Sequence, residues 1–422
     1  MSGAESDPDS GTRFDVLIVG AGHAGVHVAA TLAGSFEGSI GLLSAERREP
    51  YERPPLTKAF LVGDVTEHEL LLKPSTYWQD SGVTLLLGRQ VATVDAEDHL
   101  VVTSQGDRFS YGSLVWAAGA DPLRIDLPGM KLPGVHELRS LDDTVRFREE
   151  VRPGTRVAVV GGGFIGLEAA SACIKLGADV TVVESRSRLL ARVTGPEVAE
   201  YLLRRHRESG ARVELDASVT GIGEAADRAS SLRLGDGREI PADVVLVSVG
   251  IEPAVRVLAE AGARCSNGVE VDLQGRTSLP DVYAAGDCTC FPLDGGELIR
   301  FESLQNAVEQ GEVVARSIMG EDASYRLVPY FWSNQYDIKL KTVGLFAGYD
   351  DTIVRKGADP DSFSVIYLRR GQVCAVDCVN AMKDYVDARR VIGARIAVDV
   401  VQNPGVRLRE AIVGDQVGDS SS

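Results

Sequence analysis

The first 172 residues of the chain contain no cysteine. Enzymes that reduce disulfides beside a flavin need a redox cysteine or cysteine pair, either early in the chain or in a later C-x-x-C motif. Neither arrangement occurs, so this chemistry is excluded. The cysteines present are Cys173, Cys265, Cys288, Cys290, Cys374 and Cys378. The last four form two closely spaced pairs that suggest metal binding, but neither pair has a second pair at zinc spacing, so we expect free buried thiols and no metal site.

Long apolar runs are also missing. Segments such as 244–249 end after a few residues in glycine or charge, far short of the roughly 20 residues that cross a bilayer. Residues 1–11 are polar and acidic, without a basic start or an apolar stretch, so we expect a disordered tail and not a signal peptide. Together with the reduced thiols, this predicts a cytoplasmic protein with no membrane contact.

Positive charge is scarce. The chain has 44 basic and 61 acidic residues and a net charge of -17. Nucleic-acid phosphates require concentrated positive charge, so we expect no nucleic-acid partner. At 422 residues with 44% hydrophobic content, the chain is long enough for two or three domains with substantial cores.

What the chain does have is two copies of the pattern G-x-G-x-x-G, each directly after a short run of apolar residues. The first copy follows residues 15–19 and contains Gly20, Ala21, Gly22 and Gly25. The second follows residues 157–160 and contains Gly161, Gly163, Phe164, Ile165 and Gly166. One such pattern is weak evidence, because glycine patterns recur by chance. Both copies have the strand before and the Ala/Val-rich helix after that a dinucleotide site requires.

The chemistry of this pattern is well defined. The first glycine permits a tight turn, the second lets the backbone approach a pyrophosphate, and the third lets helix pack closely on strand. The helix N-terminus then supplies unpaired N–H groups for the phosphates. An acid ends the next strand in both copies, Glu46 after 39–46 and Glu184 after 179–184, where it can accept hydrogen bonds from ribose hydroxyls. The sequence therefore predicts two bound dinucleotides.

The remaining periodicity predicts an α/β protein with a further mixed domain. Strands are expected at 91–94, 100–103, 114–119, 212–215, 242–250 and 281–287, with helices at 201–208 and 306–319. The proline- and glycine-rich segment 121–134 is typical of a crossing between domains. From residue 328 the expected elements are strands at 338–343, 363–368 and 373–379 and a helix around 384–396.

Several segments carry a family resemblance. These are residues 51–58, Ala117-Ala118-Gly119, the second glycine motif with Glu168, and residues 282–287 and 331–337. They resemble the FAD-dependent NADH:ferredoxin reductases of bacterial oxygenase systems, the group of putidaredoxin reductase and the biphenyl dioxygenase reductase. The resemblance covers about residues 13–398. The Arg-Pro-Pro-Leu-Thr-Lys and Phe-Trp-Ser-Asn-Gln-Tyr segments are far more specific than the glycine motifs.

The fold that this resemblance implies is that of glutathione reductase, with two Rossmann-type dinucleotide-binding domains and a C-terminal α+β domain. The implied organisation is a tail at 1–12, a discontinuous FAD-binding domain at 13–121 and 249–327, an NAD-binding domain at 122–248, a C-terminal domain at 328–412 and a tail at 413–422.

The resemblance places FAD on the first glycine motif. Further contacts are implied for Glu46, Lys58, Val91, Ala118, Gly119, Arg139, Asp287, Leu304 and Trp332. The family usually has Gly-Asp-Glu at the end of the second strand, whereas this chain has Ser44-Ala45-Glu46. Independently of the resemblance, an acid at a strand end can hydrogen-bond a polyol, and a lysine in a prolyl loop can place positive charge near a ring that becomes anionic on reduction.

Three residues are implied to act in catalysis. Lys58 and Glu168 are implied to pair beside the flavin, which avoids most of the cost of burying either charge alone. Trp332 is implied to cover the flavin edge. The alternatives are a solvated lysine, an ordinary helix glutamate and a core aromatic.

The nicotinamide nucleotide is implied to occupy the second motif, with a further contact at Gly250. Glu184 favours NADH, because a carboxylate repels a 2'-phosphate. Arg186 and Arg188 leave NADPH open, since they could receive that phosphate if they curl back.

The implied reaction carries a hydride from NADH to FAD and then single electrons to a 2Fe-2S ferredoxin that serves a monooxygenase or dioxygenase. An acidic ferredoxin would need a positive patch for a transient complex. Candidates are Arg300, Lys339, Lys341, Lys383, Arg389 and Arg390. Alternatives are a rubredoxin reductase or NADH oxidase of the same fold, and an FAD redox or binding protein like apoptosis-inducing factor, which the short C-terminal domain and the acidic charge disfavour. The sequence leaves open the identity of the ferredoxin and oxygenase, and the oligomeric state.

Overall fold

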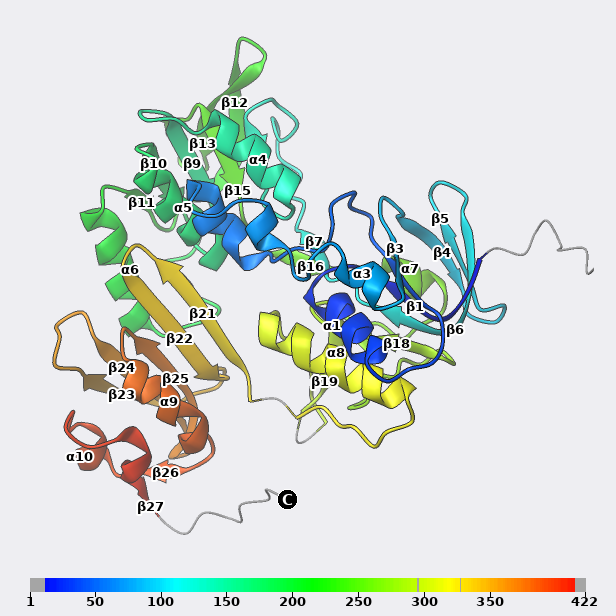
Figure 1. The fold of residues 1–422 in the computed structure, drawn as a ribbon. Helices are drawn as coiled ribbons and strands as arrows, with labels where there is room; N and C mark the ends of the chain where they lie inside the picture. The colour runs from blue at the N-terminus through cyan, green and yellow to red at the C-terminus, as the bar shows by residue number, and fades with distance from the viewer. Residues whose placement is uncertain (1–11, 294–295, 327, 414–422) are drawn as a thin grey trace, which may run out of the picture. The chain divides into compact units, whose positions relative to one another are not determined.

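The computed structural model describes residues 12–293, 296–326 and 328–413. The expected tails at 1–12 and 413–422 lie outside these residues, except for Thr12 and Val413. Contacts divide the chain into two units, both discontinuous in sequence (Figure 1). The first unit comprises 1–53, 65–121 and 251–327, and the second comprises 54–64, 122–250 and 328–422.

The first unit is built on one sheet with strand order β3-β2-β1-β6-β5-β4, in which β18 also pairs with β6. The parallel strands are β1 (Thr12–Val19), β2 (Ile40–Leu43), β3 (Val83–Leu86), β6 (Arg108–Trp116) and β18 (Val282–Ala284). The strands β4 (Val91–Asp95) and β5 (Leu100–Thr103) are added antiparallel. Val19 is in register with Leu43 and Trp116, and Trp116 with Ala284. Four strands therefore end at one level.

Both faces of this sheet are covered, which explains the continuous apolar composition of β1. Val16 and Ile18 pack on one face with side chains of α1 (His23–Ala33) and α8 (Leu304–Ile318). Leu17 and Val19 point to the opposite face and join a second cluster. The two helices lie side by side (Figure 1).

The second unit contains a second parallel sheet, with strand order β11-β10-β9-β15-β8. Its strands are β8 (Val135–His136), β9 (Arg156–Val160), β10 (Asp179–Val183), β11 (Arg212–Glu214) and β15 (Val244–Val247). Its helices are α4 (Leu141–Glu150), α5 (Phe164–Lys175) and α6 (Pro196–Glu208). A separate antiparallel sheet is formed by β12 (Val219–Ala225), β13 (Arg228–Leu234) and β14 (Glu239–Pro241).

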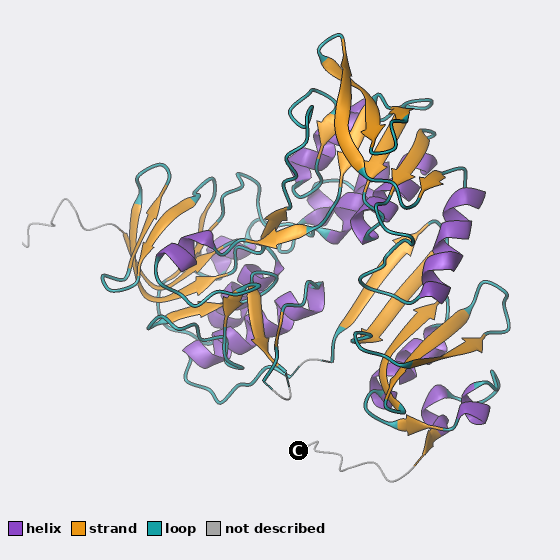
Figure 2. Ribbon diagram, turned by 180° about the vertical axis from the view of Figure 1, so that it is seen from behind, coloured by secondary structure: helices purple, strands orange, loops and turns teal. Residues whose placement is uncertain are grey.

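The last part of the second unit is an antiparallel sheet with strand order β21-β22-β25-β24-β23 (Figure 2). Its strands are β21 (Tyr330–Gln335), β22 (Ile338–Gly344), β23 (Asp351–Lys356), β24 (Phe363–Arg369) and β25 (Gln372–Val379), followed by α9 (Met382–Val391), β26 (Arg395–Ile396), α10 (Val398–Val401) and β27 (Ile412–Val413). The helix expected around 384–396 therefore ends at Val391. Gly393 has a left-handed φ of +80°, and residues 395–396 form a strand instead.

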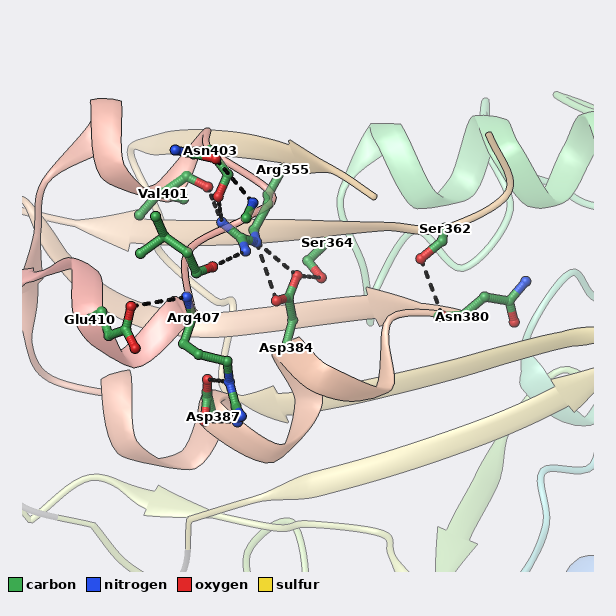
Figure 3. Close-up of polar contacts among 12 residues, drawn as sticks. Arg355, Ser362, Ser364, Asn380, Asp384, Asp387, Val401, Asn403, Arg407 and Glu410 are labelled. Atoms are coloured by element: carbon green, nitrogen blue, oxygen red, sulfur yellow. Dashed lines mark hydrogen bonds and ion pairs between the residues drawn. The ribbon is translucent and has the colours of Figure 1, made fainter. Parts of the chain in front are cut away.

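A buried arginine holds the end of this part together (Figure 3). Arg355 on β23 is 4% exposed, and its guanidinium donates hydrogen bonds to the Asp384 carboxylate. The same group donates to the backbone carbonyls of Val401, Asn403 and Val406. A buried guanidinium is tolerated only when its N–H groups have acceptors. Arg355 therefore links β23 and α9 to the last residues of the fold.

Shorter elements complete the chain. They are η1 (Pro54–Thr57), α2 (Ala59–Val62), η2 (His68–Leu70), α3 (Tyr77–Asp80), β7 (Ala120–Pro122), β16 (Ile251–Pro253), α7 (Arg256–Glu260), β17 (Val269–Glu270), β19 (Thr289–Pro292), β20 (Leu298–Ile299) and η3 (Leu408–Ala411). Within the described ranges, no helix has both the length and the apolar composition to cross a membrane.

Candidate functional site

The first glycine motif forms the turn between β1 and α1. Gly20 has a φ of +106°, and a Cβ atom there would lie 2.2 Å from the carbonyl oxygen of Ala117. A Cβ at Gly25 would lie 1.8 Å from the carbonyl oxygen of Gly20. By contrast, a Cβ at Gly22, the residue before α1, would meet nothing within 4 Å. Two glycines are thus required by packing, and the third leaves an open approach to the helix N-terminus, which suits a pyrophosphate.

The other predicted FAD residues of this unit gather at the same edge of the sheet. Glu46 follows β2, Ala118 and Gly119 follow β6, and Asp287 follows β18. Because these parallel strands end level with Gly20, the residues that follow them lie at the carboxyl edge of the sheet, where ligands bind in open α/β sheets. Val91 is the first residue of β4, and Leu304 is the first residue of α8.

Glu46 already has partners from the chain itself. Tyr51 Oη donates to Glu46 Oε2 at 2.5 Å, and Arg53 donates to Glu46 Oε1 at 2.6 Å. An electrostatic interaction also links Arg53 to Asp287. Tyr51 and Arg53 were not predicted as site residues, although both lie in the family-like run 51–58. Arg53 therefore connects two of the acids predicted to hold FAD.

The second glycine motif repeats the same construction between β9 and α5. Gly161 has a φ of +109°, and a Cβ there would lie 2.2 Å from the carbonyl oxygen of Ser248. A Cβ at Gly166 would lie 2.3 Å from the carbonyl oxygen of Gly161. At Gly163, directly before α5, a Cβ would meet nothing within 4 Å. This motif also has the geometry of a dinucleotide cradle.

The acid after β10 is held by backbone groups. Glu184 Oε2 accepts a hydrogen bond from Gly162 N at 2.7 Å, and Oε1 accepts one from Arg186 N at 2.8 Å. The guanidinium of Arg188 donates to the carbonyl oxygens of Thr194 and Ala191, at 2.6 and 3.0 Å. The orientation of Glu184 is therefore fixed by the turn, and Arg188 is engaged in its own loop.

Lys58 and Glu168 form an ion pair in the second unit. Lys58 Nζ lies 2.5 Å from Glu168 Oε2, which also accepts a hydrogen bond from Thr57 Oγ1 at 2.7 Å. The other oxygen, Oε1, accepts one from Ser333 Oγ at 2.7 Å. Glu168 is 3% exposed, although it lies on the glycine-motif helix α5. Thr57 and Ser333 belong to family-like segments but were not predicted as site residues.

The remaining predicted residues of the second unit lie on separate elements. The Phe164 and Phe331 rings lie 4.3 Å apart between centroids, whereas Ile165 is 38% exposed. Gly250 has a φ of +129° after β15, and the backbone N–H of Arg139 donates to Asp143 at the start of α4.

Trp332 lies on the edge strand β21. Ser333 and Gln335 on this strand are buried, whereas Trp332 is partly exposed on the alternate face. Its register partner on β22 is Lys341. Trp332 therefore shares a partly exposed surface with a cation.

Five of the six predicted docking cations lie on β22 and α9, which pack against each other. The Lys341 ammonium lies over the Tyr385 ring, and the Arg389 guanidinium lies over the Tyr330 ring. Lys339, Lys383 and Arg390 are exposed. Arg300 differs, because it belongs to the first unit, its side chain is only 11% exposed, and it is paired with Glu302. Arg300 is therefore a poor docking residue.

The six cysteines are all unpaired. Burial raises the pKa of the Cys173 and Cys288 thiols to about 12, which disfavours the reactive thiolate. In the ranges that the structure describes, no group of three or more His, Cys, Asp or Glu side chains could hold a metal ion.

Comparison with known proteins identifies the family. Residues 14–311 match the family described as pyridine nucleotide-disulphide oxidoreductase, and residues 330–412 match the reductase C-terminal domain. The 5,5'-dehydrodivanillate O-demethylase ferredoxin reductase subunit of Sphingobium sp. is 44% identical over 94% of this chain and 98% of its own length. The rubredoxin-NAD(+) reductase of Pseudomonas putida is 35% identical, over 87% of this chain and 96% of its own.

A solved structure has the same fold. It is the covalent putidaredoxin reductase-putidaredoxin complex, which matches with a TM-score of 0.90 and 34% identity over 95% of this chain and 98% of that one. The family resemblance and the glutathione-reductase-like fold are confirmed. The chain therefore belongs to the pyridine nucleotide-disulphide oxidoreductase family, among the ferredoxin reductases, and is a flavoprotein enzyme that uses FAD and a nicotinamide dinucleotide.

Proposed function

We propose that this enzyme takes electrons from NADH and passes them through FAD to a 2Fe-2S ferredoxin that serves an oxygenase in the cytoplasm. The observation that carries the proposal is the pair of dinucleotide-binding turns at Gly20–Gly25 and Gly161–Gly166. The chain also lacks the cysteine arrangement that a disulfide reductase requires. The relative named above as a ferredoxin reductase subunit supports the choice of acceptor.

FAD fits the first unit. The open approach at Gly22 would receive the pyrophosphate, and the carboxylates of Glu46 and Asp287 would accept hydrogen bonds from the ribose and the ribityl chain. Arg53 holds Glu46 in place and balances both acids. When bound, the flavin supplies the exchange between two-electron and one-electron chemistry that no protein side chain can perform.

NADH fits the second cradle better than NADPH. A ribose there would meet the Glu184 carboxylate, which the turn holds in a fixed orientation. A 2'-phosphate would be repelled by this charge. Arg188, one of the two arginines that could receive that phosphate, is hydrogen-bonded to two carbonyl oxygens of its own loop.

The Lys58–Glu168 pair places a compensated charge in an otherwise buried site. Lys58 also donates to the carbonyl oxygen of Pro54 at 3.1 Å, so η1 fixes the direction of its side chain. We assign Lys58 to the electrostatic support of a ring that gains negative charge, and Glu168 to holding that ammonium group.

The ferredoxin would dock on a positive surface of an otherwise acidic protein. We define the basic face as Lys339, Lys341, Lys383, Arg389 and Arg390, all of which lie on β22 and α9, two elements that pack against each other. An acidic partner would be steered toward this face, and salt would slow the encounter. Trp332 lies on the same face of the sheet as Lys341 and would be covered by that partner.

The test is anaerobic titration of the purified protein with NADH, followed by addition of electron acceptors. The flavin absorbance should bleach with NADH and return rapidly with a 2Fe-2S ferredoxin. Return only with rubredoxin would favour the second candidate, which the rubredoxin-reductase relative supports. Return only with oxygen would indicate an oxidase, and a protein without bound flavin would contradict the proposal.

A further inference from the structure

A chain of hydrogen bonds leads from Glu168 into the interior of the second unit. Ser333 Oγ lies 2.7 Å from Glu168 Oε1, and Gln335 Nε2 lies 3.0 Å from Ser333 Oγ. Gln335 Oε1 lies 2.8 Å from His206 Nε2, and His206 Nδ1 lies 2.9 Å from Tyr336 Oη. All except Tyr336 are buried, at 3% exposure or less. The links join α5, β21, α6 and the turn after β21.

We propose that this chain, from Tyr336 through His206, Gln335 and Ser333, is a positioning device that fixes the Glu168 carboxylate beside Lys58. The inference rests on the proposed function, in which Glu168 and Lys58 lie at the reacting cofactors. None of the four residues needs to touch a cofactor, so each would act through Glu168.

The donor in each hydrogen bond of this chain is determined by starting at the Glu168 carboxylate. A carboxylate that is paired with an ammonium group can only accept, so Ser333 must donate to it. Ser333 then accepts from the amide nitrogen of Gln335, which turns the amide oxygen toward His206. That oxygen requires a proton on His206 Nε2.

The hydrogen bond at the Tyr336 end of the chain is donated in the same direction. Burial keeps His206 neutral, so Nδ1 carries no proton when Nε2 does. Nδ1 therefore accepts from the Tyr336 hydroxyl at the hairpin turn, where Tyr336 has an unusual left-handed φ of +55°. Every donor in the chain thus points toward Glu168.

This arrangement does not conduct protons, because a side-chain amide does not release its proton in ordinary hydrogen-bond exchange. Its effect is orientational. Oε2 of Glu168 is held by Lys58 and Thr57, whereas Ser333 is the donor that the described structure gives to Oε1. Loss of that donor would free the carboxylate to rotate out of the plane that holds Lys58.

The decisive substitution is Gln335→Glu. It preserves the shape and the acceptor for His206, but it replaces the amide donor by a second acceptor facing Ser333. The Ser333 hydroxyl would then donate to the carboxylate at position 335 and no longer to Glu168. We expect the rate of flavin reduction by saturating NADH to fall about tenfold, the effect of one hydrogen bond to a charged group, with little change in the dissociation constant of NAD⁺.

The matched control is Asn334→Asp. It makes the same amide-to-acid change one residue away, on the exposed alternate face of β21. We expect this variant to be reduced by NADH at the rate of the unchanged protein. Ser333→Ala, which removes the donor itself, should reproduce the loss and serves if Gln335→Glu does not fold.

A second readout needs no turnover. Nitrogen-15 NMR of the imidazole should find His206 protonated at Nε2, and Tyr336→Phe should perturb the Nδ1 resonance. A proton on Nδ1 with a bare Nε2 would overturn the assigned direction. Normal reduction rates in folded Gln335→Glu and Ser333→Ala would overturn the positioning role. Failure of the unchanged protein to accept electrons from NADH would instead contradict the proposed function, and the tautomer would still test the chain.

Discussion

The Nζ atom of Lys58 lies 2.5 Å from Oε2 of Glu168, across 110 positions of sequence. The lysine side chain is 20% exposed and the glutamate side chain 4%, so the acid depends almost entirely on its partners for solvation. An ion pair of this kind contributes little net stability, but removal of one partner leaves the other uncompensated.

The first prediction follows from this asymmetry. Lys58→Met should lower the free energy of unfolding by about 3 kcal/mol, because it leaves the buried Glu168 carboxylate without its counterion. Adding Glu168→Leu to that variant should recover much of the loss, since an apolar pair needs no counterion. Urea denaturation of the two single variants and the double variant would measure the coupling. Additive losses would show that the two side chains do not interact.

The second prediction concerns the nucleotide. Glu184→Ser removes the negative charge after β10, so the ratio of kcat/KM for NADPH to that for NADH should rise about tenfold, one step of 1.4 kcal/mol. Steady-state rates with both nucleotides would measure the ratio. Glu224→Ser, at an exposed carboxylate on β12, is the control and should leave the ratio unchanged. An unchanged ratio in Glu184→Ser would show that this carboxylate does not select the nucleotide.

The third prediction concerns the buried Arg355 guanidinium and its hydrogen-bond acceptors, shown in Figure 3. Arg355→Met removes the cation that pairs with the Asp384 carboxylate. It also leaves the carbonyl oxygens of Val401, Asn403 and Val406 without the donor that Arg355 supplies. Unfolding free energy should fall by about 3 to 5 kcal/mol, the usual cost of breaking a buried ion pair. Chemical denaturation would measure this loss. Arg369→Met, at an exposed arginine that ends β24, should cost less than about 0.5 kcal/mol.

The fourth prediction is a pH dependence of stability. Burial lowers the pKa of His206 from 6.5 to about 4, although the hydrogen bond to Gln335 acts in the opposite direction. Below pH 6.5 the His206 imidazole therefore binds a proton in the unfolded chain, whereas in the folded protein it stays neutral down to about pH 4. Stability should fall as pH drops from 6.5 to 4, by about 3 kcal/mol from this group.

His206→Gln removes the titrating group and should flatten that part of the curve. Unfolding measured at several pH values in both proteins gives the difference. His27, whose pKa burial also lowers, contributes equally to both curves and cancels. Parallel curves would contradict the prediction.

The fifth prediction concerns the basic face. Lys339→Glu combined with Lys383→Glu should raise the KM for an acidic ferredoxin about tenfold at low salt, and the difference should shrink as salt screens the attraction. Flavin reduction by NADH should be unchanged. Lys131→Glu combined with Lys356→Glu, at two exposed lysines outside the basic face, changes the net charge by the same amount and is the control. Equal effects of both changes would show that only net charge matters.

The helix expected around 384–396 shows why element ends are hard to predict. Its apolar periodicity continues past the point where the helix stops, but Gly393 takes a left-handed conformation and Arg395 pairs with Val413. Pairing between segments so close to the end of the fold is decided by packing, including the contacts of Arg355, and leaves no local pattern.

The sequence by itself determined the two cradles, because the packing around Gly20 and Gly161 demands glycine at fixed spacing after a buried strand. It also determined the exclusion of cysteine-based reduction. Only the tertiary structure decided which side chains serve the carboxylates: Arg53 at Glu46, and Ser333, Gln335 and His206 behind Glu168. Glu168 and His206 are separated from their β21 partners by 165 and 129 positions. Periodicity specifies which face of an element is buried, but the partner it meets depends on how all the elements pack together.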